Sequence, residues 1–387
     1  MLNLGKHPLC DDLIKTGSKK KNKLYKIQII FCKKCATAYQ KFQVRKKILF
    51  PSNYHYRARL TKDVLRGMNE LVFDCKKTIG NLKGKVILDI GCNDGSLLNI
   101  FRKNKSFTIG VEPTNAYKDA QKKGHKIYKG YIDNRISEKI KKNHPRIDII
   151  TFTNVFAHIE NLKNLISNLK KIISEDTILI IENHYLGSII EKNQFDTFYH
   201  EHPRTYSFTS FLKISQLLEM QILKHSFPKR YGGNIRIFYA KQNKKNYDNK
   251  NLVKKEKKFF ISLKNLNKKI NLWKKNKLGT IKKLNKIYGP LPAKAFPGRA
   301  AILIKILELK NNNIDCIYEK HNSNKIGYYA PGSNIPIRSD KNLKKFIERK
   351  PIINLAWHIK KEIKSYLMNR NIKNKVINII EDKDFIK

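Results

Sequence analysis

The chain has 387 residues, of which 41% are hydrophobic, and its formal net charge is +50. This length exceeds one ordinary core and is enough for two or three domains. No apolar run reaches the roughly 20 residues that span a bilayer, and the N-terminal segment 1–9 lacks an apolar signal core. These features argue against a helical membrane protein and a secretory precursor, so we expect a soluble cytoplasmic protein with no membrane partner.

The positive charge comes from 81 Lys and Arg against 31 Asp and Glu, and most of the excess is Lys spread along the whole chain. A protein that reads nucleic acid more often concentrates Arg and aromatic residues in one patch. Abundant Asn and Ile accompany the Lys, which is the composition that an AT-rich genome favours. We therefore do not expect a nucleic-acid partner. A surface that binds polyanions stays the alternative, and a phosphorylated substrate would still feel the positive field.

The first segment, residues 1–60, is expected to form a small N-terminal lobe. It contains a β-like run at 25–31 and the pair Cys32 and Cys35, the only two of the six cysteines with metal-binding spacing. Helical periodicity over residues 60–77 indicates a helix that leads into the next domain.

In the second segment, residues 61–242, strand-like and helix-like stretches alternate. The strand candidates are 85–90, 107–112, 147–153, 177–182 and 235–240. The helix candidates between them are 96–103, 116–123, 162–173 and 208–218. Alternation of helices with continuously apolar strands is typical of an α/β domain with a mostly parallel sheet.

The last two segments differ in composition. Residues 243–285 are rich in Lys and Asn but keep apolar residues at helical spacing, which predicts a connector of one or two long helices. Residues 286–387 are expected to form a second, smaller α/β domain. They contain a helix-like run at 300–309, a turn-rich loop at 330–336 and a strand-like run at 352–357.

One turn of the α/β domain carries the signals of a ligand site. The apolar strand ending at Ile90 runs into Gly91-Cys-Asn-Asp-Gly95, which we call the cofactor loop, and then into an apolar helix. Glycines let the backbone approach a ligand closely, and the start of the helix supplies unpaired N–H donors. Glu112 ends the next strand about 20 residues after Gly91, a place that suits a ribose diol. The loop is not G-x-G-x-x-G, so a dinucleotide pyrophosphate is disfavoured.

The spacing of Asp89, Gly91 and Gly95, followed by Glu112, resembles the nucleoside-binding signature of class I S-adenosylmethionine (SAM) methyltransferases. By this resemblance the loop holds the amino-acid end of SAM and Glu112 binds the ribose hydroxyls. The segment 153–158, at the end of a later strand, would form another wall of the cleft. The expected cofactor-binding residues are Asp89, Gly91, Asn93, Asp94, Gly95, Glu112 and Asn154.

A second cluster of chemical groups lies in residues 195–202, which we call the acid–base loop. Between Phe198 and Pro203 it places a phenol, two imidazoles and a carboxylate in four consecutive positions. A carbon nucleophile beside a carbonyl must lose a proton, and its enolate must be stabilised. Tyr199, Glu201 and His202 offer a base, a hydrogen-bond donor and an orienting group. The alternative interpretation is a solvated charged loop.

These motifs, in this order, resemble the SAM-dependent sugar C-methyltransferases that act on nucleotide-linked 4-keto-deoxysugars, over nearly the whole chain. The matching segments are 54–56, 89–95, 110–113, 154–158, 182–187, 195–202, 232–236, 325–332, 335–337 and 355–357. The resemblance implies a class I SAM methyltransferase (Rossmann-like) core, a small N-terminal lobe and a C-terminal Rossmann-like α/β domain. We expect a monomer.

The resemblance also implies roles for individual residues. His202 would be the base that removes the proton from C3 of the sugar, and methyl transfer to C3, next to the C4 ketone, would follow. Tyr199 and Glu201 would support His202. Tyr54 and His158 would line the sugar pocket.

The chain departs from the family pattern at two places. Family members usually open with a further CxxC, so only Cys32 and Cys35 remain of a four-thiolate zinc site, and closed structural zinc needs four ligands. Three explanations stay open: a truncated start, a lost Zn²⁺ or substitute ligands that complete the site. Two free thiols are the alternative. In addition, Tyr231 stands where family members often carry His. The rival functions are an RNA methyltransferase, motivated by the charge, and a scaffold protein that binds SAM without turnover.

Overall fold

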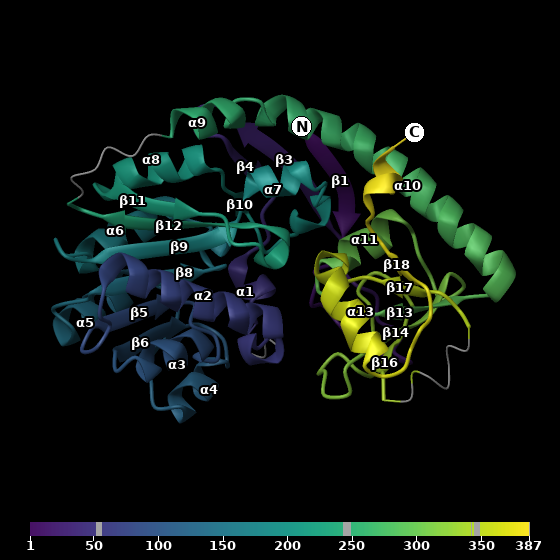
Figure 1. Cartoon of the computed structure of the whole chain (residues 1–387), viewed down its shortest axis with the longest axis horizontal. Coiled ribbons are helices and arrows are strands. Elements are labelled where there is room, and N and C mark those ends of the chain that lie inside the picture. Colours follow the sequence, from purple (N-terminus) through teal and green to yellow (C-terminus); the bar gives the residue numbers. More distant parts are fainter. Residues whose placement is uncertain (52–55, 243–248, 342, 344–348, 387) are drawn as a thin grey trace.

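The computed structural model describes residues 1–51, 56–242, 249–341, 343 and 349–386. Within these residues a four-stranded, a seven-stranded and a five-stranded sheet follow one another along the chain, and a two-stranded ribbon links two of their regions. Figure 1 shows the domains of the two larger sheets side by side, with the long helix α10 running along one edge of both. The fold is α/β, as the sequence predicts.

The N-terminal lobe completes its sheet with a strand from the core domain. β1 (Leu2–His7), β3 (Tyr25–Cys32) and β4 (Thr37–Gln40) pair antiparallel, and β10 (Arg204–Thr205) pairs with β4. The strand β2 (Ile14–Lys15) pairs with β15 (Tyr328–Tyr329) of the C-terminal domain. The short helices α1 (Lys46–Leu49) and η1 (Ala58–Leu60) follow the sheet. The lobe is therefore tied to both other domains.

The central sheet has the order β11-β12-β9-β8-β5-β6-β7. Its strands are β5 (Val86–Ile90), β6 (Phe107–Glu112), β7 (Lys126–Lys129), β8 (Ile149–Thr153), β9 (Ile178–His184), β11 (Gln221–Ser226) and β12 (Asn234–Ala240). β5 to β9 run parallel, whereas β12 is antiparallel to both β9 and β11. The strand order reverses between β5 and β8, and ligands of open α/β sheets bind at such a switch point.

Helices cover this sheet. They are α2 (Lys62–Ile79), α3 (Ser96–Lys103), α4 (Tyr117–Lys122), α5 (Asn134–Asn143), α6 (Leu162–Ile172), α7 (Leu186–Glu191) and α8 (Phe208–Leu218), with η2 (Phe156–His158), η3 (Phe195–Thr197) and η4 (Arg230–Gly232) in the loops. All five expected strands and four expected helices of this region are confirmed. The sequence analysis missed β7, α5 and β11, although Asp133 caps α5 through Ile136 N at 2.8 Å and is the residue type that such a cap favours.

The connector consists of two helices, α9 (Lys250–Glu256) and α10 (Phe259–Tyr288), as the apolar periodicity predicts. One face of α10 is buried through Leu263, Trp273 and Ile281, among others. The carboxylate of Glu256 accepts bonds from the backbone N–H groups of Phe208 and Thr209 at the start of α8 (2.8 and 2.7 Å). A carboxylate at a helix N-terminus satisfies donors that have no partner within the helix.

The C-terminal domain repeats the parallel architecture on a smaller scale. Its sheet has the order β16-β14-β13-β17-β18 and is parallel throughout. The strands are β13 (Leu291–Lys294), β14 (Ile314–Glu319), β16 (Ile337–Ser339), β17 (Ile352–Asn354) and β18 (Val376–Asn378). The helical elements are α11 (Ala300–Ile306), η5 (Trp357–Ile359), α13 (Lys360–Met368) and η6 (Asp382–Phe385). The strand order of this sheet reverses between β13 and β17, so the molecule has a second switch point.

One large apolar cluster joins the three regions. It contains Ile27 of the lobe, Ile150 of the core, Trp273 of α10 and Ile302 of α11, all of which are buried. Such a shared core favours a fixed relation between domains over independent movement. Among the described residues, no helix combines the length and the apolar character that crossing a membrane requires.

Candidate active site

A cavity of about 1010 Å³ lies where the core domain faces the C-terminal domain. Its wall on the core side includes Asp89, Glu112 and Thr153, at the ends of β5, β6 and β8. Its opposite wall includes Lys294 and Glu319, at the ends of β13 and β14. The carboxyl ends of both parallel sheets therefore face one space, and this is the edge where α/β sheets bind ligands.

The cofactor loop forms part of the core wall and leaves space close to its backbone. Gly91 has φ +73°, and a Cβ atom there would meet Val155 Cγ2 at 2.5 Å. Asn93 has φ +49° and its N–H donates to Glu112 Oε2 at 2.9 Å. Only a residue without a side chain fits at Gly91, so the loop can lie flat against a ligand.

Glu112 and Asp89 are buried carboxyl groups at this wall. Thr114 donates to Glu112 Oε1 from both its N–H (2.9 Å) and its hydroxyl (2.6 Å). Burial raises the pKa of Glu112, although these bonds oppose the change. Thr151 Oγ1 donates to Asp89 at 2.6 Å, and burial raises the pKa of Asp89 to about 7. Both groups are placed to accept hydrogen bonds from a ligand.

The expected cofactor residues do not all reach the cavity. Asp89, Gly91, Asn93, Glu112 and Asn154 line it, whereas Asp94 and Gly95 do not. The fully buried Asp94 accepts bonds from Ser96 N–H (3.2 Å), Ser96 Oγ (2.6 Å) and Arg59 N–H (3.1 Å). Neither residue lines the cavity, and the cofactor-binding role expected for Asp94 and Gly95 stays a prediction. Asp94 fixes the start of α3 and fastens the segment around Arg59 to the cofactor loop.

The acid–base loop lies across the cavity wall with three of its expected residues. Tyr199, Glu201 and His202 line the cavity, together with His158. The centre of the His202 ring is 4.2 Å from that of Tyr199 and 5.1 Å from that of His158. Within this loop Glu201 and His202 are buried and Tyr199 is half-buried, so the alternative of a solvated charged loop is wrong.

The hydrogen bond of His202 defines which ring nitrogen carries its proton. His202 Nδ1 lies 3.0 Å from the carbonyl oxygen of Thr197. A carbonyl only accepts, so Nδ1 is the donor and Nε2 keeps its lone pair. Burial, with His184 and His158 nearby, lowers the pKa of His202 well below its ordinary value, so the ring is neutral at neutral pH. A neutral ring with a free Nε2 is the form that a base requires.

Two neighbouring residues behave differently. His200 does not line the cavity, and its Nε2 lies 3.2 Å from the carbonyl of Tyr25 in the N-terminal lobe. Burial raises the pKa of the Tyr199 phenol well above its ordinary value, with Glu201 contributing. Tyr199 therefore remains a hydrogen-bond donor at neutral pH. Tyr54, the remaining expected residue, lies outside the described residues.

Three aromatic or imidazole side chains of this wall were not among the site residues expected from the sequence, which singled out Tyr231 only as a departure from the family pattern. His184, Tyr231 and His358 line the cavity, and the His184 ring lies 5.0 Å from the His202 ring and 5.4 Å from the Tyr231 ring. His184 ends β9 and lies two residues after Glu182, inside the matching segment 182–187. The signal available was its position at the end of a buried strand, the same signal that identified Glu112.

The two thiols of the N-terminal lobe do not assemble a closed zinc site. Among the described residues, no group of three or more His, Cys, Asp or Glu side chains is arranged to hold a metal ion. Cys35 Sγ lies 3.2 Å from Thr37 Oγ1, and both thiols are free. Because closed structural zinc needs four ligands, Cys32 and Cys35 do not fit the Zn²⁺ expected there.

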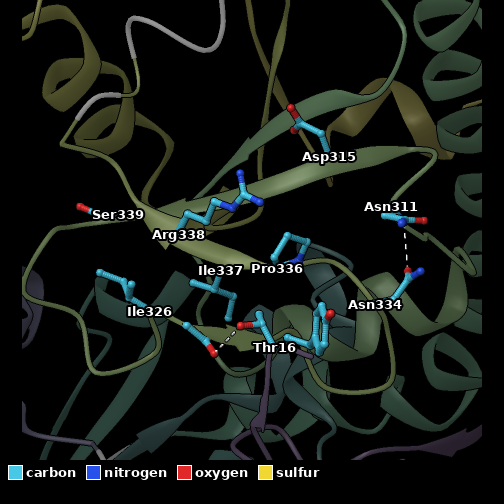
Figure 2. Close-up of a pocket in the computed structure, with 11 residues that line it drawn as sticks. Thr16, Asn311, Asp315, Ile326, Asn334, Pro336, Ile337, Arg338 and Ser339 are labelled. Carbon is cyan, nitrogen blue, oxygen red and sulfur yellow. Dashed lines mark hydrogen bonds between the residues drawn. The ribbon is translucent and has the colours of Figure 1, made fainter. Parts of the chain in front are cut away.

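A second cavity of about 570 Å³ lies on the outside of the C-terminal domain (Figure 2). Thr16 of the lobe and Asp315, Asn334 and Arg338 of the domain surround it, and the Thr16 hydroxyl donates to the Gly327 carbonyl at 3.2 Å. It shares no lining residue with the larger cavity and contains neither the imidazoles nor the cofactor loop. The chemistry predicted from the sequence therefore belongs to the larger cavity.

Both domains that form the walls of this cavity are similar to known protein families. Residues 56–223 match the family of the methyltransferase domain, and residues 229–379 match that of the C-methyltransferase C-terminal domain. The C-methyltransferase NovU of Streptomyces niveus is 24% identical over 218 residues, which cover 56% of this chain and 52% of that protein. The match thus spans about half the length of this curated relative.

Solved structures resemble the chain only distantly. The PH0226 protein of Pyrococcus horikoshii OT3 is 12% identical with a TM-score of 0.39, covering 51% of this chain and 98% of its own. Magnesium protoporphyrin IX methyltransferase of Synechocystis PCC 6803, crystallised with bound SAH, is 16% identical with a TM-score of 0.38, covering 48% and 85%. Both likenesses are too distant to bear on function.

Proposed function

We propose that this chain, which belongs to the SAM-dependent C-methyltransferases, methylates C3 of a nucleotide-activated 4-keto-deoxysugar through an enolate. The observation that carries the proposal is the state of His202: neutral, with Nδ1 held by the Thr197 carbonyl and Nε2 left as a lone pair. An oxygen or nitrogen nucleophile already carries a lone pair that can attack the methyl group. A carbon nucleophile must first lose a proton from the carbon beside a carbonyl, which requires a base.

The cofactor fits the core wall of the cavity. The backbone at Gly91 allows close approach, and Glu112 offers carboxylate oxygens beside it. When bound there, SAM supplies an electrophilic methyl group. The chain contributes by holding the two reactants in line, which is a large share of the rate enhancement in such transfers.

The proposed reaction uses the acid–base loop for a single proton transfer. His202 Nε2 removes the proton from C3, and the electron pair moves toward the C4 oxygen as the enolate forms. The protonated Tyr199 phenol donates a hydrogen bond to that oxygen. With SAM bound, its sulfonium would supply the methyl group to C3 and keep the electron pair of the broken carbon–sulfur bond. The carbonyl re-forms, and His202 returns its proton to solvent. Glu201 and His158 line the same wall and support the arrangement.

The opposite wall supports an anionic substrate. Lys294, Arg299, Lys320 and Lys325 line the cavity from the C-terminal domain. Lys294 pairs with Asp340 (2.7 Å) and Arg299 with Asp196 (2.8 Å), while Lys320 lies over the Tyr366 ring at 5.5 Å. Positive charge in a partly enclosed cavity raises the local concentration of anions, so we infer that the nucleotide diphosphate of the substrate faces this wall. The free cysteines of the chain suit the reducing cytoplasm, where we place this reaction.

Mass spectrometry of SAM reactions tests the proposal. Purified protein is incubated with SAM and a panel of nucleotide-4-keto-6-deoxysugars, with total RNA in a parallel reaction, and His202→Ala serves as the control. A mass gain of one methyl group on a keto-sugar, absent with His202→Ala, supports the proposal. Methylated RNA instead would favour the rival suggested by the net charge of +50. SAM binding with no product in any reaction would favour a non-catalytic scaffold.

A further inference from the structure

The C-terminal domain reaches into the core domain at the start of the acid–base loop. Arg299, which precedes α11, pairs with Asp196 in η3 through two bonds, Nε to Oδ2 at 2.8 Å and Nη2 to Oδ1 at 3.1 Å. Asp196 is fully buried and Arg299 is 7% exposed. A two-point bond between a guanidinium and a carboxylate fixes orientation as well as distance.

A second side chain of the C-terminal domain strengthens this contact. Trp357 Nε1 in η5 donates to Asp196 Oδ2 at 2.9 Å, and the Arg299 guanidinium lies over the Trp357 ring at 5.2 Å. Arg299 Nη2 also lies 3.5 Å from Gln194 Oε1, and Gln194 donates to the Gly232 carbonyl at 2.8 Å. The Asp196 carboxylate is thus held by two groups that both come from the second domain.

The contact continues directly to the proposed base. The residue after Asp196 is Thr197, whose carbonyl accepts the bond from His202 Nδ1. The direction of that carbonyl decides which nitrogen of His202 is protonated, and the backbone of Asp196 and Thr197 sets the direction. Arg299 and Trp357 therefore act on His202 through one residue of backbone.

We propose that Arg299, with Trp357, is a positioning residue that holds His202 in the Nδ1-protonated form, so that the docked C-terminal domain sets the state of the base. This inference rests on the proposed function of His202. A buried ion pair is weak evidence for a role in stability, because its desolvation cost offsets the attraction. Because Asp196 precedes Thr197 in the chain, the ion pair between Arg299 and Asp196 also orients the Thr197 carbonyl.

The test uses the full-length chain labelled with ¹⁵N histidine. The ring nitrogens of His202 are identified by their loss in His202→Asn, and their chemical shifts report which nitrogen carries the proton. The variants are Arg299→Met, Asp196→Asn and Trp357→Phe; Arg299→Lys is the conservative variant. Lys277→Met is the matched control, because Lys277 is also a buried cation, pairs with Asp384 (2.9 Å) and does not line the cavity.

Arg299→Met and Asp196→Asn are expected to shift His202 toward the Nε2-protonated form and to lower kcat about 10- to 100-fold, with the SAM dissociation constant unchanged. Trp357→Phe removes one donor and keeps the ring, so its effect is smaller, and it keeps the test valid if the other variants fold poorly. Arg299→Lys restores part of the shift. Lys277→Met lowers the melting temperature without altering the His202 signals.

Two other results separate this inference from the function it rests on. Folded Arg299→Met and Trp357→Phe variants whose His202 signals match those of the parent chain would overturn the positioning role. A shifted His202 signal with normal turnover would instead retain the positioning role and refute His202 as the base.

Discussion

The cofactor loop and the acid–base loop border the same cavity, but different parts of the chain hold them. Residues 91–95 are fixed mainly by near neighbours in their own domain: Asn93 N–H donates to Glu112, and the Ser96 hydroxyl donates to Asp94. The lobe adds the backbone N–H groups of Ala58 and Arg59, which donate to Asn93 and Asp94. Residues 195–202 are held from both sides by other domains. Gln40 of the lobe donates to the Tyr199 carbonyl at 2.6 Å, and Arg299 of the C-terminal domain pairs with Asp196.

This difference separates the two tasks of the site. The loop expected to hold a cofactor common to many enzymes takes most of its shape from its own sheet and from the start of α3. The groups proposed to act on the substrate are held by all three regions, and their arrangement exists only when those regions are assembled. The following changes each affect one loop and leave the other in place.

Removing the proposed base is expected to have the largest effect. His202→Asn keeps a donor for the Thr197 carbonyl but has no basic nitrogen, so kcat should fall about 10²- to 10⁴-fold with SAM affinity unchanged. Steady-state turnover assays measure kcat, and calorimetric titration measures the affinity for SAM. His200→Asn is the control, because His200 faces Tyr25 of the lobe instead of the cavity; if it loses as much turnover, the assignment of the base is wrong.

The next experiment changes the cofactor loop and leaves the acid–base loop in place. Glu112→Gln removes the charge beside Asn93 and should weaken SAM binding about 10- to 100-fold, because a hydrogen bond to a charged group contributes about 1.5–3 kcal/mol. Calorimetric titration measures the affinity. Asp148→Asn is the control: Asp148 is also buried and accepts a bond from Val86 N–H at 2.8 Å, but it lies at the other end of β5. Equal SAM affinity in Glu112→Gln and the parent chain would remove Glu112 from the cofactor site.

A pair of glycine variants tests whether the cofactor loop depends on local shape. Gly91→Ala and Gly84→Ala both force alanine to a φ near +75°, at a cost of about 1–2 kcal/mol. Only at Gly91 does the added carbon meet Val155, which adds about 1–3 kcal/mol and fills space beside the ligand. Denaturant unfolding and SAM titration should show a larger loss of stability, and weaker SAM binding, for Gly91→Ala alone. Equal losses would mean that the close approach at Gly91 is unimportant.

The smallest expected effect is a pH dependence of stability carried by the acid–base side of the site. Burial lowers the pKa of His158 and of His200 to about 4, whereas unfolded histidine has a pKa near 6.5. The unfolded chain therefore binds more protons between these values, so stability is complete above about pH 6.5 and is lost as the pH falls toward 4. Asp89, whose pKa burial raises to about 7, acts in the opposite direction over this range.

Thermal unfolding across a pH series measures this dependence. Near pH 5 unfolding should take up about one proton for each of these histidines, and His200→Gln should reduce the slope. Substitution of the exposed His321 by Gln is the control for the same change of side chain at the surface. A melting temperature that rises as the pH falls from 6.5 to 4 would contradict the expected burial of neutral imidazoles.

The sequence predicted the parts of the fold that repeat a local pattern. The apolar strand ending at Ile90, its glycine turn and the acid at the end of the next strand specify a switch-point site without reference to other domains, and the structure has that arrangement. The short polar strand β7 and the half-polar strand β11 escaped notice, because their place in the sheet comes from pairing and not from apolar content.

The acid–base loop was found from its composition, but its geometry was not. Nothing near Tyr199 in sequence indicates that Gln40 bonds its carbonyl or that Arg299 reaches Asp196, more than a hundred residues away. The contribution of His184 also depends on tertiary packing, since only the fold brings the end of β9 against His202. Asp94 and Gly95 lie outside the cavity lining for the same reason: spacing identifies a loop, but it does not say which side faces the cavity.

The sharing of strands between distant segments has a consequence for synthesis of the chain. β4 obtains its outer neighbour only when residues 204–205 have been made, and β2 pairs with Tyr328 and Tyr329. At ribosomal speeds of about 5–20 residues per second, the first strands to emerge wait tens of seconds for their last partners. During that interval the outer edge of β4 (Thr37–Gln40) is open to pairing with other chains. Yield in a cell should therefore depend on chaperones that shield nascent strands and on slow, cool expression.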